Sequence, residues 1–124
     1  MVLITFSCTN RLNEIQKLSK VNFPDDSTLL IYENNFENTI AFKIAVEKKK
    51  VDDFLLLNHF SQVDTLKTNP LAKTSTDKAQ IYYISHNFIK REKIYGKDLL
   101  IFQNQNTRIV VNRQTSELWG LIDY

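Results

Sequence analysis

The sequence predicts an α+β domain in which two short helices pack on a mainly antiparallel sheet that ends in a C-terminal β-meander. Residues 39–47 place an apolar side chain at every second position, which is typical of a strand with one buried face. Residues 11–20 repeat apolar side chains at helical spacing. From residue 80 onward, short apolar runs alternate with turn residues, as in hairpins. This order favours helices packed on a largely antiparallel sheet.

The composition is that of one soluble globular domain and excludes several kinds of site. The chain has 124 residues, of which 43% are hydrophobic and 24% charged, with a formal net charge of +2. Cys8 is the only cysteine, so neither an intrachain disulfide nor a zinc site built from thiolates can form. The sequence contains no glycine-rich phosphate loop and no G-x-S-x-G nucleophile elbow. We therefore expect no metal and no cofactor.

The first half of the chain is expected to hold a helix at 11–20, a hairpin and a second helix at 51–60. The hairpin joins strands 28–33 and 39–47 through a loop at 34–38, where Asn residues favour a turn. One face of the second strand should be buried beneath the second helix. The residues predicted for this core are Ile40, Phe42, Ile44, Val46, Phe54 and Leu55.

Two helix starts can be predicted from capping and charge. Thr9 or Asn10 can cap the helix at 11–20, because a short polar side chain accepts a hydrogen bond from the first turn. Asp52 and Asp53 would lie in the first turn of the helix at 51–60, where the helix dipole favours carboxylates.

The second half is expected to be almost entirely β-structure. A short extended piece at 63–66 leads into a polar loop at 67–78 that contains Pro70. Short turns then separate the candidate strands, so each connection is expected to be a hairpin. These strands are 80–85, 89–95, 99–103, 107–112 and 117–124.

The N-terminal segment carries the one resemblance to a known class of protein. Residues 3–8, Leu-Ile-Thr-Phe-Ser-Cys, resemble the end of a bacterial lipoprotein signal, in which a small residue precedes the cysteine that receives the lipid. The resemblance is to small, uncharacterised bacterial lipoproteins and implies lipidation of Cys8. The alternative is that residues 2–6 form a first β-strand and that Cys8 is a small buried apolar residue. Residues 1–8 are thus either a signal-peptide remnant or a first strand, and residues 9–124 form the domain.

Two classes of function remain open from the sequence. The first is a non-enzymatic domain of the bacterial envelope, lipid-anchored or periplasmic, that binds an unknown protein or envelope component, as an inhibitor or immunity-type module would. The second is a cytoplasmic nucleic-acid-binding domain that uses the basic second half. Residues 63–124 carry nine basic and six acidic side chains, which is a weak positive field for nucleic acid.

The candidate binding surface combines basic and aromatic side chains of the second half. On a strand, Arg91, Lys93 and Tyr95 would share one face, where an aromatic ring can stack on a base beside cations that contact phosphates. The full set comprises Tyr82, Arg91, Lys93, Tyr95, Arg108 and Trp119.

Catalysis is the least favoured interpretation. His59 is expected at the end of the second helix, where an imidazolium complements the helix dipole, and His86 in a turn. A hydrolase that pairs one of these histidines with a carboxylate ranks third. We therefore predict no catalytic residues and no enzymatic activity.

Overall fold

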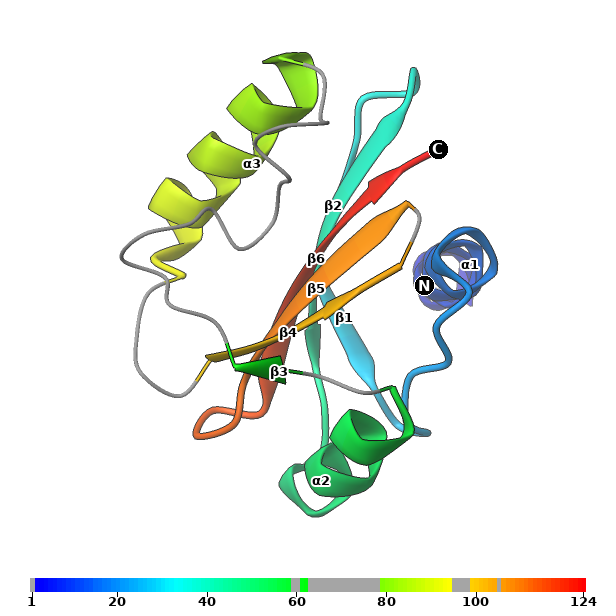
Figure 1. Ribbon diagram of the computed structural model, residues 1–124. Coiled ribbons are helices and arrows are strands. Elements are labelled where there is room, and N and C mark those ends of the chain that lie inside the picture. Colours follow the sequence, from blue (N-terminus) through cyan, green and yellow to red (C-terminus); the bar gives the residue numbers. More distant parts are fainter. Residues whose placement is uncertain (1, 59–60, 63–78, 95–98, 105) are drawn as a thin grey trace.

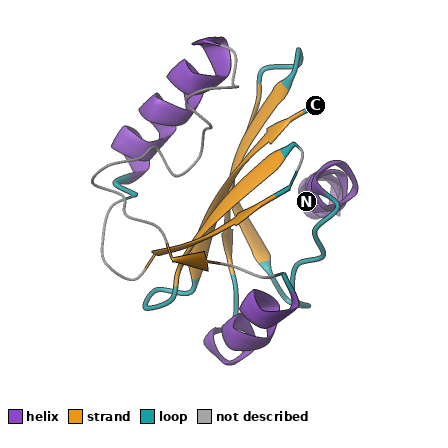
Figure 2. Cartoon of the chain, viewed as in Figure 1, coloured by secondary structure: helices purple, strands orange, loops and turns teal. Residues whose placement is uncertain are grey.

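The computed structural model describes residues 2–58, 61–62, 79–94, 99–104 and 106–124. These residues form three helices and a six-stranded antiparallel sheet, which confirms the predicted α+β class and C-terminal meander. The strand order is β1-β2-β6-β5-β4-β3. Figure 2 shows the strands in orange with the helices around them. The elements are α1 (Val2–Ser19), β1 (Thr28–Asn34), β2 (Thr39–Ala45), α2 (Lys48–Leu57), β3 (Ser61–Gln62), α3 (Ala79–Glu92), β4 (Leu99–Gln103), β5 (Thr107–Asn112) and β6 (Glu117–Asp123).

The helices lie on both faces of the sheet. Helices α1 and α2 cover one face and α3 lies against the other (Figure 1). The α1/α2 face buries the predicted core, including Ile40, Phe42 and Ile44 of β2 with Phe54 and Leu55 of α2. Phe23, which follows α1, packs edge-on against Phe42 at a centroid distance of 6.0 Å and stacks on Phe54 at 5.7 Å. The predicted packing of the second helix over β2 is thus confirmed.

Helix α1 begins earlier than predicted. It includes residues 2–10, so the expected first strand at 2–6 is wrong, and Thr9 and Asn10 lie inside the helix rather than at its cap. No proline or glycine interrupts the chain before Pro24, so a helix held by the buried Ile15 can continue towards the N-terminus. At its other end, Asn104 Nδ2 and Asn106 Nδ2 donate to the carbonyls of Ser19 and Leu18 at 2.7 and 2.8 Å.

Helix α3 replaces two of the predicted strands. Residues 80–85 and most of 89–95 are helical, and His86 lies within α3 rather than in a turn. Phe88 and Ile89 are buried between exposed neighbours, a helical pattern in which they pack on the sheet. The aromatic and β-branched residues of this segment favoured a strand, and packing on the second face of the sheet overrides that preference.

The second core lies between α3 and the sheet. Its buried members come from α3, from Ile94 beyond it, and from four strands. They are Ala41, Phe88, Ile89, Ile94, Leu99, Ile101, Val110, Trp119 and Leu121.

The remaining element boundaries are close to the predicted ones. Helix α2 begins at Lys48, so Asp52 and Asp53 lie beyond its first turn, contrary to the prediction. Strands β4, β5 and β6 match the predicted 99–103, 107–112 and 117–124 within one residue. The predicted extended piece at 63–66 and loop at 67–78 lie outside the described residues.

Candidate functional site

Among the described residues, the strand face that was predicted to carry the basic side chains is absent. Arg91 belongs to α3, and Lys93 follows α3 with a positive φ of 55°. They therefore do not share a strand face, and Tyr95 lies outside the described residues. Tyr82 lies in α3, and Arg108 lies in β5 opposite Leu121 of β6. The prediction failed because a helix turns successive residues by about 100°, whereas a strand alternates them between two faces.

Two of these residues already have partners within the fold. The Arg91 guanidinium pairs with Glu33 of β1 at 2.6 Å and lies 5.4 Å from the centre of the Phe88 ring. Trp119 is only 5% exposed and therefore offers no ring face to a base. Both residues join α3 to the sheet.

A half-buried polar cluster lies at the same junction. Lys43 Nζ is 3.5 Å from Glu92 of α3 and 3.3 Å from Glu117 of β6. The ammonium also lies 5.4 Å from the centre of the Trp119 ring, and Trp119 Nε1 donates to Glu92 Oε1 at 3.3 Å. Each charged group in the cluster thus has an oppositely charged neighbour. We interpret the cluster as a clamp that fixes the end of α3 to β2 and β6.

A shallow pocket of about 390 Å³ lies between α2 and the turn that follows β5. Its lining includes Asp52 and Arg113, which form an ion pair at 3.1 Å. Lys48, Val51 and Gln114 complete the lining. General acid–base catalysis needs a positioned acid and a positioned base, and the pocket supplies no such pair other than this ion pair.

The tip of the β1–β2 hairpin, residues 34–38, is the feature that sequence reasoning missed. It presents Phe36 with 85% of its surface exposed and a φ of 60°. The prediction treated this segment only as a loop. The available signal was an apolar aromatic residue inside the run Asn-Asn-Phe-Glu-Asn, where small or polar residues are usual.

Side-chain hydrogen bonds hold the hairpin tip. Asn35 Oδ1 accepts from the backbone N–H groups of Glu37, Asn38 and Thr39 at 3.0, 3.0 and 2.9 Å. Asn34 Oδ1 accepts from the N–H of Phe36 at 2.8 Å and from the Tyr124 hydroxyl at 2.5 Å. These bonds replace the ladder hydrogen bonds that a turn lacks.

The hairpin tip is also connected to α1. Asn34 Nδ2 donates to the Tyr32 hydroxyl at 3.1 Å, and that hydroxyl donates to Glu14 of α1 at 3.2 Å. Burial raises the pKa of the Tyr32 hydroxyl above its usual value; the hydrogen bond from Asn34 opposes the rise, and the Glu14 carboxylate adds to it. The Arg11 guanidinium lies 4.9 Å from the centre of the Tyr32 ring.

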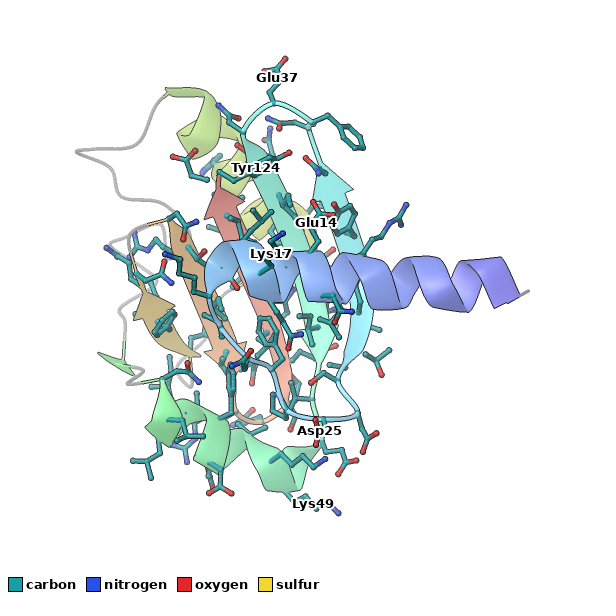
Figure 3. All side chains as sticks on the ribbon, turned by 90° about the vertical axis from the view of Figure 1, so that its right-hand side faces the viewer. Glu14, Lys17, Asp25, Glu37, Lys49 and Tyr124 are labelled. Carbon is teal, nitrogen blue, oxygen red and sulfur yellow. The ribbon has the colours of Figure 1, made fainter. Side chains whose placement is uncertain are left out.

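The N-terminal part of α1 extends past the edge strand β1 (Figure 3), and Cys8 belongs to the first half of this helix. The C-terminal part crosses the sheet, where Ile15 and Ser19 are fully buried. The segment that resembles a lipoprotein signal is therefore the part of α1 that leaves the sheet.

Three further observations concern ligands, the membrane and relatives. Among the described residues, no group of three or more His, Cys, Asp or Glu side chains is placed to hold a metal ion. His86 is exposed on α3, and His59 lies outside the described residues. None of the described helices has the length and hydropathy needed to cross a membrane.

Comparisons with protein-family models, curated proteins and solved structures found no match to this chain.

Proposed function

We propose that this chain is a non-enzymatic, partner-binding domain of the bacterial cell envelope, held at the membrane by a lipid on Cys8. The observation that supports the tether is the course of α1, whose C-terminal part packs on the sheet while its N-terminal part extends past β1. A lipid attached to the part of α1 that extends past β1 would leave the packing of the two cores unchanged.

The spacing along α1 places the tether close to the folded body. Leu12, which packs against the core and is the first such residue among those of α1 whose side chains the structure describes, follows Cys8 by four positions. Four helical residues span about 6 Å, so a lipid on Cys8 would hold the domain against the membrane surface. Two or three acyl chains give stable anchoring, because each buried CH₂ contributes about 0.8 kcal/mol.

Membrane fractionation of cells that express the complete precursor tests the tether. We expect the wild-type protein in the detergent-extracted membrane fraction and the Cys8→Ser variant in the soluble fraction. Ser7→Ala is the matched control, because it keeps a small residue before the cysteine and should leave the protein in the membrane. Thermal melting of the purified Cys8→Ser domain should be unchanged. A wild-type protein that is wholly soluble, or a Cys8→Ser variant that still fractionates with membranes, would disprove the tether.

A further inference from the structure

We infer that the hairpin tip is the contact surface of the domain, and that Phe36 inserts into an apolar pocket with a basic rim on a partner protein. The inference deepens the proposed function, because it names the surface and partner chemistry of the binding domain. It depends on the geometry of residues 34–38 and not on the tether.

Phe36 has a conformation and an exposure that folding does not explain. Its φ of 60° lies in the left-handed region, where a bulky side chain is strained and Gly or Asn is favoured. Its ring is 85% exposed, so it gains almost nothing from burial. Asn or Gly would meet the needs of the turn better. The presence of Phe at this position therefore points to a contact outside the chain.

Hydrogen bonds hold the backbone of the hairpin tip, and with it the position from which the Phe36 ring projects. The three N–H groups that donate to Asn35 and the two groups that donate to Asn34 fix the backbone on both sides of Phe36. A contact that is already ordered loses little conformational entropy on binding. Exposed aromatic anchors on rigid loops commonly provide the largest single contributions to protein–protein affinity.

Charge identifies the kind of partner. Glu37 at the hairpin tip and Asp123 at the end of β6, which pairs with Thr39 of β2, are both exposed. Within the part of the chain that the structure describes, neither carboxylate has a cation within 4.0 Å. Anionic lipid and nucleic acid would be repelled by this end of the molecule. A protein pocket with Lys or Arg at its rim complements both the ring and the carboxylates.

The hairpin tip remains accessible in a tethered domain. In Figure 3 the tip, marked by Glu37, points along the strands, whereas the N-terminal part of α1 leaves the sheet across the strands. A membrane at the end of α1 would therefore lie beside the sheet and not over the hairpin tip.

Site-specific photo-crosslinking tests the inference in the organism that encodes the chain. p-Benzoylphenylalanine replaces Phe36 in one variant and Leu57 in the control, since Leu57 is similarly exposed at 78% on α2. We expect one protein adduct from position 36 and none from position 57. An adduct with lipid, an adduct with a second copy of the chain, equal adducts from both positions or no adduct would each overturn the inference.

Binding measurements with the crosslinked protein, once purified, test the chemistry. Phe36→Asn should weaken the affinity at least tenfold, and Leu57→Asn should leave it unchanged. Glu37→Lys should weaken binding at low salt and flatten its salt dependence. Unchanged affinity in Glu37→Lys would overturn the basic rim, and unchanged affinity in Phe36→Asn would overturn the anchor.

These outcomes are separable from those of the tether. A soluble wild-type protein that still gives the position-36 adduct would disprove the tether alone. A membrane-bound protein without that adduct would disprove the anchor alone.

Discussion

Gly120 of β6 lies directly under the Phe42 ring. A Cβ built on Gly120 would lie 2.0 Å from Phe42 Cζ, far closer than any real contact. Phe42 is fully buried and pairs with Gly120 across β2 and β6. A glycine within a strand usually weakens it, but here its missing side chain makes room for one of the largest fully buried side chains. A core aromatic ring therefore explains why glycine stands at this position.

Gly120→Ala should therefore lower the free energy of unfolding by about 1–3 kcal/mol, because the ring must shift in a packed core. Urea denaturation measures this change. Phe42→Leu, which makes room for the methyl group, should offset part of the loss in the double variant. Simple additivity of the two single variants would show that the two side chains do not compete for the same space.

At the scale of elements, the sequence predicted the helices and strands whose apolar spacing or turn residues lie within one short segment. Strand β2 carries a large apolar residue at every second position, Ile40, Phe42 and Ile44. Asn residues at the ends of β1 and β5 accept backbone hydrogen bonds from the turns that follow, as Asn112 does from the N–H of Gln114 at 2.9 Å. Helix α3 could not be predicted from local preference, because its segment is rich in Tyr and Ile, which favour strands. Its helical state depends on burying Phe88 and Ile89 against the second face of the sheet.

The clamp formed by Lys43, Glu92, Glu117 and Trp119 should contribute to the docking of α3. Lys43→Met keeps most of the side-chain volume but leaves two half-buried carboxylates without their cation. We expect a loss of about 1–3 kcal/mol in the free energy of unfolding. Lys49→Met is the control, because Lys49 is 79% exposed in its pair with Glu47 and should change stability by less than about 0.5 kcal/mol. Equal effects of the two substitutions would contradict the clamp.

At the scale of the whole molecule, one sheet separates two cores and brings the hairpin tip and the C-terminal end of β6 to the same end of the strands. The order of elements and most of the α1/α2 core could be predicted, because both follow from periodicity within single segments. The candidate binding surface could not be predicted from the sequence, because it depends on whether each residue lies in a helix, a strand or a turn. Arg91 lies in a helix and not in the predicted strand. The sequence shows that Phe36 is an aromatic residue in a turn, but its φ and its exposure are known only from the structure.

If Phe36 serves binding and not folding, the stability of the Phe36→Asn variant should reveal this without any partner. Asn is tolerated in the left-handed conformation, so relief of strain should raise the free energy of unfolding by about 1 kcal/mol. Asn35→Ala is the companion variant and should lose about 1–2 kcal/mol, because three backbone N–H groups lose their acceptor. Urea denaturation with an unchanged slope gives both values. A Phe36→Asn variant that is less stable than the wild type would show that Phe36 is a structural residue and not a binding residue.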